Sequence, residues 1–174
     1  MRNLLVGVVI AVSAASVLAE SAAGLRWTAP ASWKVEAARP MRAATYSIAP
    51  VAGDQGIAEC VVNYFGPGQG GGVDANIERW RGQVLGADGK PATSKIDKRT
   101  GRVPITVIDT TGTYTGMGGP MMSGSKPAAG YRLIGAIVEG PGGSVFFKLT
   151  GPAKTIAAQQ KNFEQLLSSI QIDK

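Results

Sequence analysis

The sequence predicts an α+β domain in which a mainly antiparallel sheet packs with two helices. Short segments rich in β-branched and aromatic residues recur along the chain, and glycine, proline or polar turn residues separate them. Two longer segments instead place their apolar residues at helical spacing. The resulting order is strands, a helix, four strands and a second helix, which indicates a layered α+β domain.

The first 19 residues predict a secretory signal peptide that is removed by cleavage after Ala19. Arg2 supplies a positive charge, residues 4–17 form an apolar run, and Val17-Leu18-Ala19 matches a small-x-small cleavage pattern. Retention as a membrane anchor is the alternative, but the run is short and contains serines. Cleavage leaves residues 20–174 as one domain without a transmembrane span, expected in the periplasm or outside the cell.

The first half of the mature chain is expected to form strands bounded by turn residues. These strands cover residues 25–27, 33–36, 41–48 and 57–65. In the last of them Ala58, Cys60, Val62 and Tyr64 fall on one face of the strand. Cys60 is therefore predicted to be buried and not a reactive thiol, because no base or cation adjoins it in the sequence.

A glycine-rich loop at residues 66–72 leads into the first predicted helix. Asp74 is a suitable N-cap for a helix that begins at Ala75. The buried stripe of this helix is expected to contain Ile77, Trp80, Arg81, Val84 and Leu85. Residues 66–71 also match the G-x-G-x-x-G pattern of dinucleotide sites. We interpret the match as a structural loop, because Pro67 removes a backbone donor and the polar segment after the helix does not suit a buried parallel strand.

The second half predicts an antiparallel meander followed by the second helix. The expected strands cover residues 93–100, 102–114, 131–139 and 144–150. Pro104 predicts a sheet edge or a bulge at its position. Residues 115–130 form a long loop rich in Gly, Pro and Met. The last helix begins near Pro152, and its apolar face is expected to contain Ile156, Phe163, Leu166, Leu167 and Ile170.

Several segments resemble the PsbP-like family, which includes extrinsic proteins of photosystem II, a Ran-binding nuclear import factor and small secreted bacterial proteins. The resemblance is carried by Trp27-x-x-Pro30-x-x-Trp33, by VFFKLTGPAKTI and FEQLLSSI within residues 145–170, and by the order of elements between them. Residues 75–83 and 112–122 are similar to segments of uncharacterised bacterial envelope proteins. The resemblance covers nearly all of the mature chain, and it implies a binding or assembly module more than an enzyme.

The residue inventory excludes several classes of catalytic site. The sequence contains no histidine and one cysteine, which removes the Ser-His-Asp triad, the Cys-His dyad and most metal sites. We therefore expect no catalytic residue and no cofactor. Loss of Arg2 with the signal lowers the formal net charge from +6 to +5. Outside the cytoplasm this modest basic excess suits an anionic envelope component better than nucleic acid.

Two groups of residues are candidates for contact with a partner. The first group crowds the long loop, which together with the glycine-rich loop is the expected binding surface: Met117, Met121 and Met122. The second group surrounds one predicted hairpin and is basic: Lys95, Lys98, Arg99 and Arg102. This basic group has a second interpretation, as a solvated edge whose lysines prevent edge-to-edge pairing of sheets.

The sequence thus predicts an exported, non-catalytic binding or accessory module whose partner is a protein or an anionic envelope component. Two alternatives remain open. The three methionines could bind copper(I) weakly, since thioethers are soft ligands, or they could fill gaps against the sheet. A hydrolase could use two facing carboxylates on predicted strands, for which the candidates are Glu59, Asp109 and Glu139.

Overall fold

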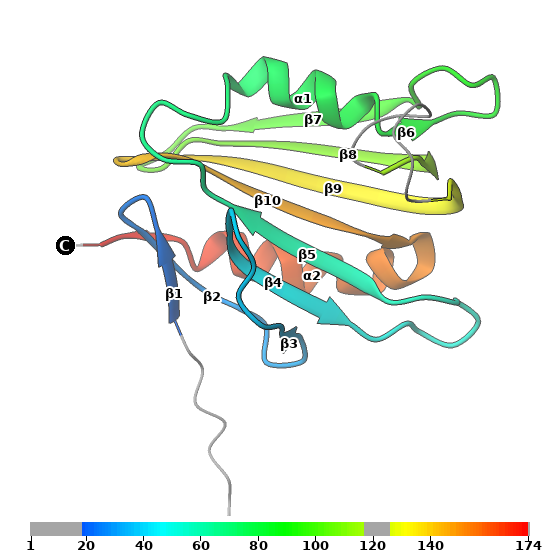
Figure 1. The fold of residues 1–174 in the computed structure, drawn as a ribbon, viewed down its shortest axis with the longest axis horizontal. Helices are drawn as coiled ribbons and strands as arrows, with labels where there is room; N and C mark the ends of the chain where they lie inside the picture. The colour runs from blue at the N-terminus through cyan, green and yellow to red at the C-terminus, as the bar shows by residue number, and fades with distance from the viewer. Residues whose placement is uncertain (1–18, 117–125, 174) are drawn as a thin grey trace, which may run out of the picture.

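The computed structural model describes residues 19–116 and 126–173, and it confirms an α+β fold dominated by antiparallel sheet (Figure 1). The described helices are α1 (Val73–Arg81) and α2 (Ala153–Ser168). The described strands are β1 (Ala19–Ala22), β2 (Leu25–Thr28), β3 (Lys34–Val35), β4 (Arg42–Ile48), β5 (Ala58–Asn63), β6 (Val84–Leu85), β7 (Ser94–Arg99), β8 (Ile105–Tyr114), β9 (Ala128–Gly140), β10 (Gly143–Pro152) and β11 (Gln171–Ile172).

The strands form two sheets. The larger sheet has the order β3-β4-β5-β10-β9-β8-β6, and β7 pairs with the other end of β8. The smaller sheet contains β1, β2 and β11, so the C-terminal segment lies against β2. Every pair that the described residues form is antiparallel. The strands after α1, β6 and β7, both run antiparallel to β8, which agrees with our interpretation of the glycine pattern as a loop.

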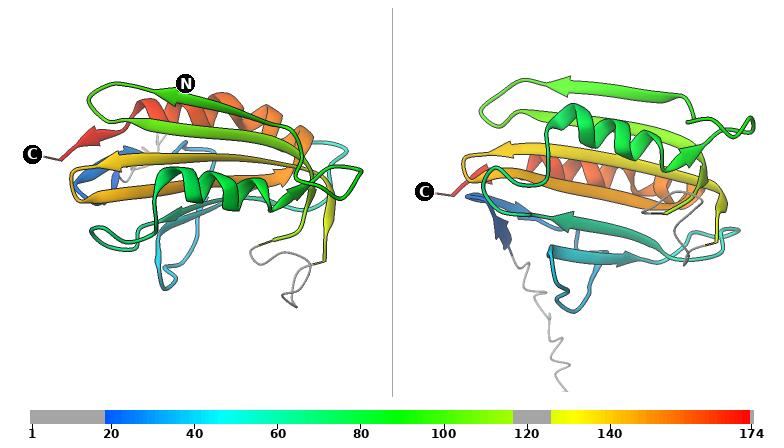
Figure 2. Two further views of the ribbon diagram at one scale, coloured as in Figure 1. Left: turned by 90° about the horizontal axis from the view of Figure 1, so that it is seen from above. Right: turned by 45° about the horizontal axis from the view of Figure 1, so that its top comes forward.

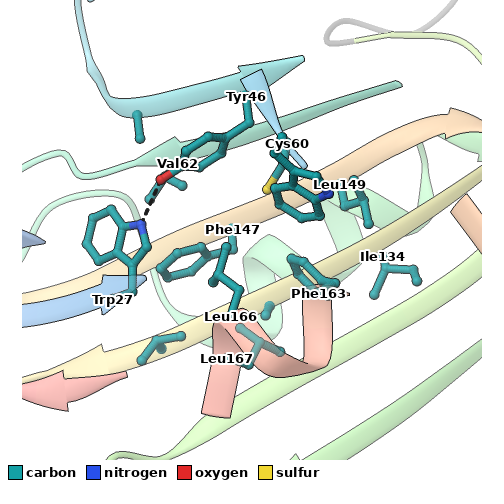
Figure 3. Close-up of a cluster of buried hydrophobic side chains, with 14 of the residues drawn as sticks. Trp27, Tyr46, Cys60, Val62, Ile134, Phe147, Leu149, Phe163, Leu166 and Leu167 are labelled. Carbon is teal, nitrogen blue, oxygen red and sulfur yellow. Dashed lines mark hydrogen bonds between the residues drawn. The ribbon is translucent and has the colours of Figure 1, made fainter. Parts of the chain in front are cut away.

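One face of the larger sheet packs against α2, and α1 lies on the opposite side of the sheet (Figure 2). In the core on the α2 side, the ring of Trp27 lies edge-on to Phe147 with centroids 5.2 Å apart. Its indole N–H donates to the hydroxyl of Tyr46 at 2.9 Å (Figure 3). Tyr46 donates in turn to Glu20. Cys60 is fully buried in this core, as predicted, and burial raises the pKa of its thiol.

The core on the other face lies under α1. Ile77 and Trp80 point from the helix onto the sheet, where they join a cluster with Val84, Ile108 and Phe146. Gly135 of β9 provides the space for the indole, because a Cβ atom at this position would lie 2.4 Å from Cε3 and Cζ3 of Trp80. The prediction that Ile77, Trp80 and Val84 hold this segment on the sheet is confirmed.

Some predicted boundaries were wrong. α1 begins at Val73 after Gly72, so Asp74 lies in the first turn and is not the N-cap. The helix ends at Arg81, and Val84 with Leu85 forms β6. Helical spacing did not distinguish a helix that continues through Val84 from a helix followed by a short strand, because a strand paired with β8 points Val84 into the same core. The short strands β1 and β11 also went unpredicted, since pairing with β2 and not local propensity specifies them.

A distant loop caps the N-terminus of α2. Pro152 precedes the helix and provides no side-chain hydrogen bond. Instead, the carboxylate of Asp54 accepts hydrogen bonds from the backbone N–H and the hydroxyl of Thr155, both at 2.7 Å. The same hydroxyl accepts a hydrogen bond from the backbone N–H of Val51 at 3.1 Å. These bonds fix the loop between β4 and β5 on the start of α2.

Candidate functional site

The side chain of Lys148 is a buried cation on the α1 face of the sheet. It lies in the middle of β10, between Phe147 and Leu149, whose side chains belong to the core on the other face. The residue is 7% exposed. Its ammonium group lies 3.3 Å from the hydroxyl of Tyr114 and 3.4 Å from Oε1 of Gln83. Both partners are neutral, so neither compensates the charge.

Burial lowers the pKa of Lys148 to about 8, because removal from water disfavours the charged form. The carboxylate of Glu59 raises this pKa in part, and the guanidinium groups of Arg42 and Arg79 lower it further. Among the described residues, no carboxylate lies within 4.0 Å of the Lys148 or Arg79 side chain. The site therefore contains uncompensated positive charge.

Lys148 lines a pocket of about 210 Å³ between α1 and the strands β4, β5 and β10. We call it the Lys148 pocket. Its lining is formed by Pro40, Met41, Arg42, Asn63, Phe65, Arg79, Trp80, Phe146 and Lys148. A second, more open hollow of about 580 Å³ adjoins it through shared walls at Met41, Phe65 and Arg79. Gly70 and Gly71 of the glycine-rich loop line this outer hollow.

The start of β4 positions one side of the pocket. Arg42 donates to Glu59 at 3.2 Å and to the hydroxyl of Thr45 at 3.3 Å, so its charge is compensated. Met41 precedes it with a φ of 62°, a left-handed conformation that is unfavourable for a residue with a side chain. The amide of Asn63 donates to the carbonyl of Met41 at 2.9 Å and holds it in this conformation.

Asn76 of α1 connects the helix to the glycine-rich loop on the other side. Its amide donates to the carbonyl oxygens of Gly70 at 2.8 Å and Gly72 at 2.9 Å, and its own oxygen accepts from Arg79. Gly70 requires glycine, since its φ is 90° and a Cβ atom would lie 2.8 Å from the ring of Phe146. These contacts fix the glycine-rich loop beside the pocket.

The basic residues predicted to contact a partner do not share one surface. Lys98 pairs with Asp74 at 3.6 Å, on the side of α1. Arg99 points to the other face and donates to Glu164 of α2 at 2.7 and 3.0 Å. Lys95 lines an open hollow with Asp109 and Arg132. Arg102 lines a separate groove beside α2 and β11.

The remaining predicted candidates are also dispersed. Met117, Met121 and Met122 lie outside the described residues. Glu59 and Asp109 point to opposite faces of the sheet, and each is paired with an arginine, Arg42 and Arg132 respectively. Glu139 points to the same face of the sheet as Glu59. The residue of β10 that pairs with Glu59 also pairs with Leu133 of β9, and Glu139 lies six positions after Leu133. That separation is roughly 20 Å along the strand, so the three carboxylates do not converge.

Sequence reasoning missed Lys148, although a signal for it exists. The segment VFFKLT contains one lysine in an otherwise apolar run within a predicted central strand. Such a run is typical of a strand with both faces buried, and a lysine there is expected to be buried and costly unless it is paired. Arg42 and Arg79 gave no such signal, because Arg42 lies at the start of a predicted strand and Arg79 follows Glu78 in a predicted amphipathic helix.

Comparison of the chain with known protein families and with characterised proteins finds no match. Across residues 19–116 and 126–173, no helix combines the length and the apolar character needed to cross a membrane. In the same residues no three His, Cys, Asp or Glu side chains group as they would around a metal ion.

Proposed function

We infer that this protein is an exported, non-catalytic binding module, and that the Lys148 pocket is its binding site for a small anion. The single observation that carries the proposal is the Lys148 side chain, which is buried, has no carboxylate within 4.0 Å among the described residues and lines a pocket. Burying an unpaired charge costs several kcal/mol. Such a cost is typical of functional sites, where perturbed titratable groups line clefts.

Other observations support a binding role over catalysis. The pocket combines cations with an apolar wall. The carboxylates considered for a hydrolase lie apart, and two of them, Glu59 and Asp109, are in ion pairs. The resemblance to PsbP-like proteins implies a binding or assembly module. Export remains a proposal from the charge and apolar pattern of the first 19 residues.

The proposal is tested by titrating the purified protein with acetate, benzoate and inorganic phosphate, followed by calorimetry. We expect saturable binding of at least one of these anions, and its loss in Lys148→Met. Lys161→Met, which makes the same change on an exposed position of α2, is the matched control and should bind as the parent does. If no anion binds, or if Lys148→Met binds equally well, the proposed site is wrong.

The pH dependence provides a second readout. The charged or titratable groups around Lys148 are Glu59, Arg42, Arg79 and Tyr114. Burial raises the pKa of Tyr114, so this hydroxyl stays neutral where Lys148 titrates. The affinity for an anion should therefore be highest below pH 8 and should fall as pH rises and the Lys148 ammonium loses its proton. An affinity that is constant from pH 7 to pH 10 would contradict the role of Lys148.

A further inference from the structure

We propose that the ligand of the Lys148 pocket is a monocarboxylate attached to an aromatic ring or a short apolar group of similar size. This inference rests on the proposed function, and it adds the chemical class of the ligand. It comes from three properties of the pocket: where its positive charge lies, what its walls are made of, and how large it is.

The charge of the pocket favours a single negative charge. Of the three cations in its lining, Arg42 is already paired with Glu59 at 3.2 Å. Lys148 and Arg79 have no carboxylate partner among the described residues, and Arg79 is shared with the more open hollow. A carboxylate at Lys148 would compensate its buried charge. A dianion would bring excess negative charge close to Glu59, which already faces the site.

Three aromatic side chains form part of the wall of the pocket. The ring of Phe146 packs against two other rings. Its centroid lies 5.6 Å from that of Phe65, with an angle of 53° between the ring planes. It lies 6.5 Å from the centroid of Trp80, with the planes at 90°. Edge-to-face and tilted arrangements of this kind are the preferred geometry between aromatic rings, and a further ring can extend them. An inorganic anion would leave this apolar wall in contact with water, whereas a ring or short alkyl group would cover it.

The volume fits one ring and one carboxylate. A cavity of about 150 Å³ lined by apolar side chains holds benzene, and the Lys148 pocket measures about 210 Å³. The difference of about 60 Å³ equals the liquid volume of about two water molecules, which leaves space for a carboxylate group. Larger substituents would extend into the adjoining hollow beside Gly70 and Gly71.

Met41 stands at the border between the pocket and the hollow. The residue is 70% exposed, although its side chain is large and apolar, and its backbone is strained at a φ of 62°. Strain that a neighbouring group maintains, here the amide of Asn63, is concentrated at ligand sites. A flexible thioether can adapt to ligands of different shape. Met41 is therefore positioned to cover the apolar part of a bound ligand.

The test compares ligands that share either the charge or the ring. We expect calorimetry at pH 7 to show benzoate and phenylacetate binding at least tenfold more tightly than acetate or inorganic phosphate, and benzylamine not binding. Lys148→Met should abolish benzoate binding, while Lys161→Met should not. Met41→Ala should weaken benzoate several-fold and leave acetate unchanged. Circular dichroism and tryptophan fluorescence establish that each variant is folded.

The outcomes separate the two proposals. If acetate or phosphate binds as tightly as benzoate, and Lys148→Met abolishes this binding, the ligand class is wrong and the anion site stands. If benzylamine binds as tightly as benzoate, the assignment of the charge is wrong. If none of the anions binds in a manner that depends on Lys148, both the ligand class and the proposed function are wrong.

Discussion

The ammonium nitrogen of Lys148 lies 3.3 Å from the hydroxyl of Tyr114 and 5.8 Å from the centroid of its ring. Tyr114 is itself stacked on Tyr131, with centroids 6.3 Å apart and planes inclined by 7°. The aromatic ring offers the ammonium group a weak attraction, but no formal negative charge. Lys148 is thus positioned by neutral partners, which leaves its charge available to a ligand.

Replacement of Lys148 by methionine should change how stability depends on pH. The pKa of Lys148 is about 8 in the folded protein, below the ordinary value of 10.5. Between these values the unfolded chain binds a proton that the folded chain does not, so this group makes the parent more stable as pH rises from 8 to 10.5. The contribution is about 3 kcal/mol over that interval.

Chemical denaturation of the parent and of Lys148→Met at several pH values measures this contribution. The variant should be more stable than the parent at pH 7, and the difference should shrink as pH rises to 10.5. The contributions of other titrating groups to the free energy of unfolding cancel in this comparison. The free energy of unfolding of Lys161→Met should equal that of the parent at every pH. Parallel stability curves for Lys148→Met and the parent would show that the buried charge carries no such cost.

The contact between Trp80 and Gly135 should appear as a strong coupling in a double-mutant cycle. Trp80→Ala removes a buried indole and should cost about 3–5 kcal/mol. Gly135→Ala places a methyl group 2.4 Å from the indole and should cost about 1–3 kcal/mol through overpacking. Once the indole is absent, the nearest remaining atom is Cγ2 of Ile108 at 3.1 Å, so Gly135→Ala should cost much less in the Trp80→Ala background than in the parent. Denaturant unfolding of the four proteins gives the coupling, and additive effects would contradict the contact.

The capping of α2 by Asp54 should be visible as a loss of stability in Asp54→Ala. This variant leaves the backbone N–H and the hydroxyl of Thr155 without their acceptor, and the expected cost is about 0.5–2 kcal/mol. Asp54→Asn retains an acceptor oxygen of similar reach and should lose less. Thermal unfolding ranks the three proteins, and a parent-like Asp54→Ala would show that the cap is not stabilising.

Much of the fold could be predicted from local pattern, and much of the site could not. Alternating apolar residues predicted the strands around Cys60, and the helical spacing of Ile77 and Trp80 predicted the face of α1. The short strands β1 and β11 were missed, because each has too few residues for a period to appear and each is specified by its pairing with β2. The site was missed because Arg42, Arg79 and Lys148 come from three elements that are distant in sequence.

The sequence by itself determined the class of fold, the burial of Cys60 and the absence of histidine-dependent chemistry, because periodicity and residue inventory are properties of the chain. Only the tertiary structure decided where the charges lie. Strand pairing beside β10 and the docking of α1 on Gly135 enclose Lys148. A neighbouring arginine pairs with Glu59, whereas no carboxylate among the described residues pairs with Lys148. Burial and ion pairing depend on distances between remote segments, and those distances exist only once the sheet has formed.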